Sequence, residues 1–423
     1  MSKVQKIWAR QIIDSRGMPT VEAVCQLDTG EVTVASVPGG ASTGTYEALE
    51  LRDGDPEKYL GKSVYNAVKN VNETLGPGVW GLDVSDQEKI DKRLIELDGT
   101  KNKSKYGANA ILSVSLVTTK GGAQATKQPL YKWINTLAKR VGIKADIKVP
   151  TPIFNMINGG LHGAGNLDFQ EFHVIPATSK NYSDSLRLGV EVYMILGKDL
   201  ERRGAIHSVG DEGGYAPNLF TNADALEVLY ESIKQTQYQI GRDVFLGLDV
   251  AASVFYKNGE YTIRDKSGPL KDEALLDYYK YINSQYHLAS IEDPFHEDAW
   301  ESWRKLVDAF QGQLTVVGDD LLATNLERVE KAVAEKACNA ILVKPNQVGT
   351  ISETLEVIKR SRDAGWKVTT SHRSGETNDW FIADFAVGTG SDFVKFGAPA
   401  RGERVIKYNR LLSIESELLS QNL

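Results

Sequence analysis

The fold is decided by residues 244–347, where four short apolar runs each end at a charged residue. The runs read VFLGLDV (244–250), ASIEDPF (289–295), TVVGDDL (315–321) and AILVKPN (340–346), and the charged residues are Asp249, Glu292, Asp319 and Lys344. A carboxylate at the end of a buried strand is costly without a cation nearby. On strands of one closed parallel barrel, the four side chains would converge on one point. The runs therefore predict a metal site with a lysine beside it.

The spacing of the charged residues indicates the kind of barrel. From Thr151 onward, short apolar strands alternate with amphipathic helical segments, and marked strand ends recur at positions 292, 319, 344, 372 and 395. A (β/α)8 barrel of ~250 residues uses about 30 residues per unit, which fits this spacing. The longer interval before residue 292 contains SVFYKNGEYTI (253–263), which we expect to form a hairpin that turns at Asn258-Gly259.

The first part of the chain has a different pattern, in which strands precede helices. IWARQIID (7–14), TVEAVCQLD (20–28) and EVTVASV (31–37) read as strands, and helical periodicity begins at Val64. A second helix is expected to open at Ser85 with a capping box to Glu88 and to end near Gly99, and a third to span 107–127.

The sequence therefore predicts an α/β protein of two domains. Residues 1–138 are expected to form a smaller α+β capping domain, and residues 139–423 a (β/α)8-type, TIM-like barrel that carries the catalytic groups. The charged segment KRVGIKADIK (139–148), which leads to Pro150, marks the start of the second domain.

The composition is that of an ordinary globular protein, with 41% hydrophobic and 25% charged residues among 423. A formal charge of −7 argues against a nucleic-acid partner, because phosphate backbones require clustered surface cations.

Cys25 and Cys338 lie far apart without a C-x-x-C partner, which predicts buried thiols in a reducing compartment. The start, MSKVQKIWARQIID, lacks the apolar core of a signal peptide, and no run approaches the ~20 apolar residues of a membrane helix. We expect a cytoplasmic protein without a membrane partner.

The three carboxylates predict the class of metal. Asp249, Glu292 and Asp319 offer oxygen ligands with no cysteine or histidine beside them, and such sets select Mg²⁺ or Mn²⁺ over Zn²⁺. Asp320 follows Asp319, and because adjacent strand residues face opposite ways, we expect only Asp319 to reach the metal. The alternative is that each carboxylate caps the helix that follows it.

Lys344 and Glu212 are candidates for a base and an acid. Pro345 keeps Lys344 extended at its strand end. Cations nearby would lower the pKa of Lys344 so that it can act as a base, and the alternative is a salt bridge to the carboxylates. Glu212 stands among glycines in SVGDEGGYAP (208–217), either exposed to whatever enters the cleft or in a plain turn. As an acid, Glu212 should lie across the cleft from Lys344.

The segment SHRSGET (371–377) and Lys395 predict a pocket for a strongly anionic substrate. Arg373 offers a planar fork that matches phosphate, and Ser374 adds a hydroxyl donor. His372 either contacts the ligand or caps a helix. Two glycine-rich loops, GGASTG (39–44) and NGGLHGAGN (158–166) with His162, are candidate lids over this pocket or ordinary turns.

Segments along nearly the whole chain, from about residue 5 to about residue 418, resemble the enolase family. In chain order they are GASTGTYEALELRDGD, DGTKNKSKYGANAILSVSL, NGGLHGAGNLDFQEF, GDEGGYAPN, IEDPF, GDDLLATN, VKPNQVGT, SHRSGETNDWFIADFAVG and GAPARGERVIKYNRLL. SHRSGET together with GDEGG…AP is specific to the family in this combination, whereas IEDP alone is not.

The resemblance implies reversible dehydration of 2-phosphoglycerate to phosphoenolpyruvate in glycolysis and gluconeogenesis, with two Mg²⁺ per active site. It implies Lys344 as the base at C2 and Glu212 as the acid at the C3 hydroxyl. It implies that Asp249, Glu292 and Asp319 bind the first Mg²⁺ and Ser42 the second. The implied substrate contacts are His162, Gln170, Glu171, Ser371, His372, Arg373, Ser374 and Lys395. The implied assembly is a homodimer or a dimer-based octamer.

Five residues depart from those usual in the family, and none is a predicted ligand, base or acid: Met18, Gly39, Lys101, His173 and Phe396. Two other functions stay open, namely a related enzyme acting on a different acid and a non-catalytic protein that keeps the scaffold. Arg373, Ser374 and the loop with Ser42 favour a phosphorylated substrate over the first. Retention of the base, the acid and the carboxylates argues against the second.

Overall fold

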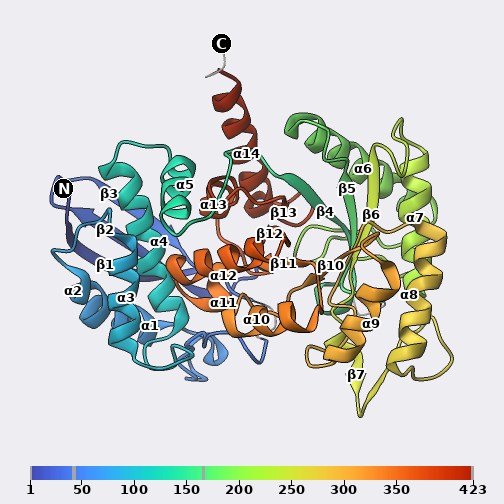
Figure 1. Cartoon of the computed structure of the whole chain (residues 1–423), viewed down its shortest axis with the longest axis horizontal. Coiled ribbons are helices and arrows are strands. Elements are labelled where there is room, and N and C mark those ends of the chain that lie inside the picture. Colours follow the sequence, from blue (N-terminus) through green and yellow to red (C-terminus); the bar gives the residue numbers. More distant parts are fainter. Residues whose placement is uncertain (1, 41–43, 164–166, 421–423) are drawn as a thin grey trace.

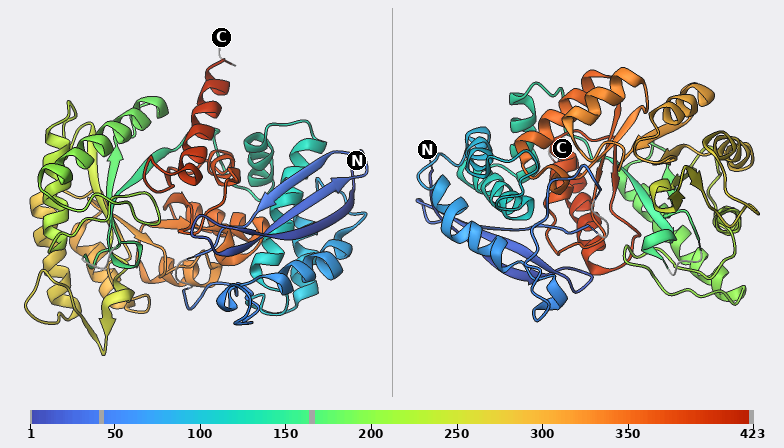
Figure 2. Two further views of the ribbon diagram at one scale, coloured as in Figure 1. Left: turned by 180° about the vertical axis from the view of Figure 1, so that it is seen from behind. Right: turned by 90° about the horizontal axis from the view of Figure 1, so that it is seen from below.

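The computed structural model describes residues 2–40, 44–163 and 167–420 of the chain. A small N-terminal unit lies beside a barrel in Figure 1, and both views of Figure 2 show the same side-by-side arrangement. The N-terminal unit contains β1 (Val4–Ile13), β2 (Pro19–Leu27), β3 (Val32–Ser36), α1 (Tyr65–Asn70), α2 (Gly76–Val79), α3 (Gln87–Asp98), α4 (Ala108–Ala125) and α5 (Leu130–Arg140).

The barrel unit follows from Thr151. Its strands are β4 (Thr151–Asn158), β5 (Glu171–Pro176), β6 (Val244–Asp249), β9 (Ser290–Glu292), β10 (Thr315–Gly318), β11 (Ala340–Val343), β12 (Lys367–Ser371) and β13 (Phe393–Lys395). Its helices are α6 (Tyr182–Arg202), α7 (Asn222–Lys234), α8 (Asp272–Tyr286), α9 (Trp300–Phe310), α10 (Leu326–Glu335), α11 (Pro345–Val348), α12 (Ile351–Asp363), α13 (Phe381–Gly388) and α14 (Gly402–Ser420). The predicted fold class is confirmed.

The N-terminal sheet is antiparallel with the order β1-β2-β3. The alternating residues Val21, Ala23 and Leu27 of β2 are fully buried, and α4 packs against β2 and β3. Cys25 and Cys338 are both free and buried, as predicted, and burial raises the pKa of both thiols.

The helix α3 begins two residues later than the sequence suggested. Its capping residue is Asp86, whose carboxylate accepts the backbone N–H of Lys89 at 3.2 Å. Ser85 instead donates its hydroxyl to Asp83 at 2.8 Å, which explains why the expected cap at Ser85 is wrong. The helix ends at Gly99, as expected, because Gly99 takes up a positive φ of 68°.

The barrel is closed, with the strand order β10-β11-β12-β13-β4-β5-β6-β9. The expectation of an all-parallel barrel is wrong for one strand, because β5 pairs antiparallel with both β4 and β6. A parallel neighbour requires a crossover, usually through a helix, and the described residues between β4 and β5 contain only a short 3-10 turn. Two helices, α6 and α7, then precede β6, so the regular pattern in which helices connect successive barrel strands begins only at β6.

The insertion after β6 forms the expected hairpin. β7 (Tyr256–Lys257) and β8 (Glu260–Tyr261) pair antiparallel, and the two turn residues Asn258 and Gly259 have positive φ angles of 54° and 85°. Both angles are those of the tight turn that an Asn-Gly pair favours.

The strand ends bring the predicted charged residues to one rim of the barrel. Asp249, Glu292 and Lys395 are the last residues of β6, β9 and β13, and Asp319 and Lys344 directly follow β10 and β11. Because β5 runs antiparallel, its first residue lies at this same rim, where Glu171 is paired with Asp249 in the ladder. The reversed strand thereby adds a further carboxylate to the site.

The two units are joined by buried polar contacts. The side-chain amide of Asn135 in α5 donates to the carbonyl of Gly388 in α13 at 2.9 Å. The boundary between residues 138 and 139 stays a prediction, and it falls within the last turn of α5. Within the described segments, no helix combines the length and apolar character needed to cross a bilayer.

Asp91 in α3 is a buried carboxyl group at the contact between the two units. One carboxylate oxygen accepts the backbone N–H and the hydroxyl of Ser352, in α12, at 2.9 and 2.7 Å. The other accepts the side-chain amide of Gln87 at 2.9 Å. Burial outweighs these hydrogen bonds and raises the pKa of Asp91 to about 6.

The raised pKa of Asp91 predicts a pH-dependent stability. The folded state holds this proton more tightly than the unfolded chain, so the stabilisation is complete below the pKa of an unfolded aspartate and is lost as the pH rises through about 6. An asparagine cannot ionise. Asp91→Asn should therefore gain about 2–3 kcal/mol in free energy of unfolding relative to wild type between about pH 4 and 7. Denaturant unfolding of both proteins across this range measures the difference, and a constant difference would contradict the assignment.

Candidate active site

One pocket at the C-terminal rim of the barrel contains most of the predicted site residues, and it encloses about 520 Å³ including its open mouth. The predicted residues that line it are His162, Gln170, Glu171, Glu212, Asp249, Asp319, Lys344, Ser371, His372, Arg373, Ser374 and Lys395. Glu292 lies beside the pocket, in contact with Lys395. Ser42 lies outside the described residues.

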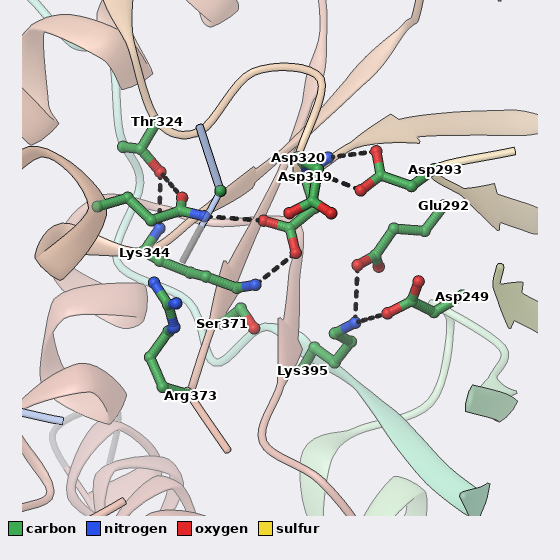
Figure 3. Close-up of polar contacts among 12 residues, drawn as sticks. Asp249, Glu292, Asp293, Asp319, Asp320, Thr324, Lys344, Ser371, Arg373 and Lys395 are labelled. Atoms are coloured by element: carbon green, nitrogen blue, oxygen red, sulfur yellow. Dashed lines mark hydrogen bonds and ion pairs between the residues drawn. The ribbon is translucent and has the colours of Figure 1, made fainter. Parts of the chain in front are cut away.

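Lys395 is the central cation of the pocket floor. Its Nζ donates to Glu292 at 2.8 Å and to Asp249 at 3.0 Å (Figure 3). It also lies 3.4 Å from Glu171. Burial by itself lowers the pKa of this lysine, but the surrounding carboxylates outweigh burial and raise it well above its usual range. Lys395 is therefore held as an ammonium ion.

One ammonium does not compensate the carboxylates around it. Burial and the neighbouring charge of Asp249 raise the pKa of Glu292 well above its usual range, although Lys395 acts in the opposite direction. Gln170 adds only a neutral amide, which donates to Asp249 at 3.3 Å. The carboxyl groups at the floor of the pocket therefore cannot all ionise unless a further cation compensates them.

Lys344 contacts Asp319 directly, as Figure 3 shows. The other carboxylate oxygen of Asp319 accepts the side-chain amide of Gln347 at 3.1 Å. Burial opposes the charge on Lys344, but Asp319 outweighs burial and raises the pKa of this lysine. The salt bridge that was the alternative for Lys344 is observed, and the lowering of its pKa by bound cations stays a prediction. In this arrangement Asp319 therefore holds Lys344 in its protonated form.

Asp293 is a carboxylate of this rim that sequence reasoning missed, and Asp320, which was expected to face the opposite way from Asp319, lies at the rim as well. Oxygens of Asp293, Asp319 and Asp320 all lie within 4.8 Å of one another. Asp293 accepts the backbone N–H groups of Asp319 at 3.0 Å and of Asp320 at 2.7 Å (Figure 3). Burial and the neighbouring aspartates raise the pKa of Asp293 well above its usual range and that of Asp320 to about 7.

Strand alternation does not separate Asp319 from Asp320. Both residues follow the last residue of β10, and both line the pocket. The extended geometry that turns neighbouring side chains to opposite faces has ended at this point. The sequence did contain a signal for both additional carboxylates. Asp320 directly follows the predicted ligand Asp319 in GDDL, and Asp293 directly follows the predicted ligand Glu292 in IEDP.

The donor set of the rim fits a hard divalent cation. The carboxylates are Glu47, Glu171, Glu212, Asp249, Glu292, Asp293, Asp319 and Asp320, and the lysine and arginine cations are Lys344, Arg373 and Lys395. Oxygen-rich sets without thiolates favour Mg²⁺ or Mn²⁺. Buried carboxylates in such excess require a cation for compensation.

Glu212 lies on a different wall of the pocket from Lys344. The side-chain amide of Asn155, in β4, donates to Glu212 at 3.2 Å, and β4 is three strands from β11 around the barrel. His162 Nδ1 lies 3.5 Å from Glu212 and 3.2 Å from Glu171. Burial and Glu171 raise the pKa of Glu212, but His162 and His372 outweigh them and lower it to about 2.

The glycines of the loop with Glu212 are required by close packing. A Cβ on Gly210 would lie 2.3 Å from the carbonyl oxygen of His162, and one on Gly214 would lie 2.5 Å from the side chain of Asn158. Only glycine allows the loop with Glu212 to approach the glycine-rich loop 158–166 this closely. The turn thus positions Glu212 against His162.

Arg373 is held by a residue of the N-terminal unit. Its Nη1 donates to the carboxylate of Glu47 at 2.9 Å, and both side chains are buried. Gly39 and Gly375 exchange two backbone hydrogen bonds of 2.8 and 2.9 Å, which join the first glycine-rich loop to the loop after β12. Ser374 completes this wall through a contact of 3.2 Å between its hydroxyl and Nε2 of His162. Glu47 was missed because its partner is distant in sequence.

A closed barrel with carboxylates, a buried lysine and an arginine at the C-terminal ends of its strands defines a barrel enzyme. Two family models match the chain: "Enolase, N-terminal domain" over residues 4–134 and "Enolase, C-terminal TIM barrel domain" over residues 146–423. The chain therefore belongs to the enolase family, and it is an enzyme of the enolase superfamily. This family is metal-dependent, in agreement with the acidic rim.

The surplus charge of the rim predicts stabilisation by a divalent cation. A ligand that binds only the folded state at about 100 times its dissociation constant adds about 2.7 kcal/mol to the free energy of unfolding. Thermal unfolding with and without the cation measures this effect, and Asp249→Asn should reduce it strongly. Asp243→Asn removes a partly exposed carboxylate paired with Lys180 and should leave the response intact. An equal loss in both variants would contradict a site at the rim.

Proposed function

We propose that this enzyme catalyses the reversible, Mg²⁺-dependent dehydration of 2-phosphoglycerate to phosphoenolpyruvate, the enolase reaction of glycolysis and gluconeogenesis. The observation that carries the proposal is that one pocket combines a largely buried lysine, Lys344, with a glutamate on another wall and an acidic rim that includes a buried arginine. These groups are what removal of a proton next to a carboxylate and loss of a hydroxyl group require.

The residues proposed to hold the first Mg²⁺ are Asp249, Glu292 and Asp319, which offer oxygen ligands at one rim. Ser42 is proposed as a ligand of a second Mg²⁺ on the family resemblance alone. Bound Mg²⁺ would stabilise the negative charge that develops on the substrate carboxylate as the C2 proton leaves.

Lys344 is proposed as the base that takes the C2 proton. Its side chain is 13% exposed, and its backbone is extended before Pro345 with φ −131° and ψ 104°. Its present partner is Asp319, which is itself a proposed metal ligand. Engagement of Asp319 by a cation would release Lys344 and lower its pKa, so that base function and metal binding are coupled.

Glu212 is proposed as the acid that gives a proton to the departing C3 hydroxyl group. The hydrogen bond from Asn155 and the close packing of its own loop against the glycine-rich loop 158–166 fix its position. Its low pKa in the protein alone, to which His162 and His372 contribute, means that it must acquire a proton when the anionic substrate enters. Negative charge on the substrate acts in this direction, because like charge raises the pKa of a carboxyl group.

The remaining polar groups are proposed to bind the two anionic ends of the substrate. Arg373 and Ser374 suit the phosphate, and Lys395 suits the carboxylate. Gln170, Glu171, His162, Ser371 and His372 form the rest of the wall. Arg373 must exchange its contact with Glu47 for the phosphate, so Glu47 neutralises the arginine until substrate arrives.

The proposed assembly and location follow from the family resemblance. They are a homodimer, or an octamer built from dimers, in the cytoplasm, with no nucleic-acid or membrane partner. Mass measurement of the purified protein in solution distinguishes the two assemblies.

The reaction is tested with purified protein and 2-phosphoglycerate. Phosphoenolpyruvate should form in the presence of Mg²⁺, and chelation by EDTA should abolish its formation and excess Mg²⁺ restore it. Ultraviolet absorbance of the product measures the rate. Absence of turnover at high enzyme concentration would rule out this substrate and favour a related enzyme acting on another acid.

The separate roles of base and acid are tested by two variants. Lys344→Ala should lose exchange of the C2 proton with deuterated water by at least about 10²-fold, because the proton acceptor is gone. Glu212→Gln should keep this exchange and lose dehydration by a similar factor. NMR of the substrate measures exchange, and circular dichroism confirms the fold. Loss of both activities in Glu212→Gln would refute the separation of roles.

A further inference from the structure

Arg404 binds two loops of the pocket from behind. It lies in α14, and its side chain is fully buried. Its Nη1 donates to the carbonyl oxygen of Arg373 at 2.6 Å. Its Nη2 donates to the carbonyl oxygens of Ser374 at 2.6 Å and Asp211 at 3.0 Å. One guanidinium therefore joins the loop after β12 to the loop that carries Glu212.

The same guanidinium determines the proton position on His372. Nη1 of Arg404 lies 2.8 Å from Nδ1 of the ring. A guanidinium has only donors and stays charged, so Nδ1 must accept this hydrogen bond and carries no proton. The neutral ring then has its proton on Nε2. Burial lowers the pKa of His372, Glu212 acts in the opposite direction, and the charge of Arg404 lowers it further.

The other ring nitrogen of His372 faces Glu212. Nε2 lies 3.2 Å from a carboxylate oxygen of Glu212 and makes no hydrogen bond in this arrangement. Gly397 encloses the ring, because a Cβ there would lie 3.0 Å from Cε1 of His372 and 2.5 Å from the carbonyl oxygen of Glu212. The ring thus stays beside Glu212, and its tautomer decides whether the carboxyl group faces a donor or a lone pair.

We propose that Arg404 is a positioning residue that holds His372 as the neutral tautomer protonated on Nε2, so that Glu212 faces a neutral donor. The charged groups that face this ring are Arg404 from α14, Glu212 from its loop and Glu171 from β5. A doubly protonated ring would hold Glu212 as a carboxylate, and a lone pair on Nε2 would compete for its proton. A neutral donor permits Glu212 both to carry a proton and to release it.

The tautomer is measured in the resting protein by nitrogen NMR with isotope-labelled histidine rings, because protonated and bare ring nitrogens have separate chemical shifts. His372→Gln identifies the signals of this ring. We expect a bare Nδ1 and a protonated Nε2 at neutral pH. A proton on Nδ1 would overturn the proposal, and this measurement needs no substituted arginine.

Two variants test the cause. Arg404→Lys keeps the charge but cannot span the four acceptors, so the His372 ring should become a mixture of tautomers. Arg404→Met removes the repelling charge, so the ring should take up its second proton at a higher pH than in wild type. If Arg404→Met does not fold, Arg404→Lys decides alone. A ring state like that of wild type in the folded variants would refute the role of Arg404.

Lys407 provides the matched control. It lies in the same helix, is fully buried, and donates to the carbonyl oxygen of Thr377 at 3.0 Å in the loop after β12. Among the described residues it makes no hydrogen bond or ion pair with His372, because its other partners are Glu376 and the carbonyl oxygen of Glu403. Lys407→Met should lower stability and leave the His372 tautomer unchanged. If Lys407→Met changed the tautomer of His372 in the same way as the Arg404 variants, the change would reflect a general loss of packing around α14. That result would overturn the proposal.

The catalytic consequence rests on the proposed function, and kinetics test it separately. Arg404→Lys should lower kcat by about 10–100-fold, the usual cost of losing a partner that orients a functional group, with a smaller change in KM. If wild-type protein does not convert 2-phosphoglycerate, the proposed function fails while the NMR result still decides the tautomer. A changed tautomer with unchanged kcat would refute the link to Glu212.

Discussion

Buried negative charge at one rim of the barrel is the constraint on which the rest of this structure depends. Glu171, Asp249 and Glu292 surround the single ammonium of Lys395 in a region with little access to water. Carboxylates that leave water without full compensation cost free energy, and the raised pKa values of Glu292 and Asp293 are one expression of that cost. Two ion pairs compensate part of this charge, because Lys344 contacts Asp319 and Arg373 contacts Glu47. A bound divalent cation would compensate more of it.

The features that sequence reasoning predicted correctly are those with a local or periodic signal. Strands that end in charged residues at similar intervals after β9 identified the barrel and the rim, because parallel strands joined by helices bring their C-terminal ends to one side. The hairpin at Asn258-Gly259 was predictable because two residues alone determine the turn. Arg373 and Ser374 were found from a short motif, and the pocket contains both.

The features that escaped prediction depend on partners distant in the chain. The reversed direction of β5 follows from a connection without a crossover helix, which strand patterns do not reveal, and it alone brings Glu171 to the rim. The pKa of Lys344 depends on which charge stands beside it, and sequence gives the charges without their distances. Arg404 lies in α14, outside every glycine-rich loop and strand end, and only the folded chain places it behind His372.

The paired backbone hydrogen bonds between Gly39 and Gly375 have a consequence for how this protein can evolve. Residues of both units build the wall of the pocket. Replacing one unit by that of another protein would therefore have to preserve these two hydrogen bonds. An insertion in the small unit that displaced Gly39 would also displace Gly375 and, two residues before it, Arg373 in the wall of the pocket. Substitutions and insertions near Gly39 are thus constrained by the pocket residues around Gly375, which lie more than three hundred residues away in the sequence.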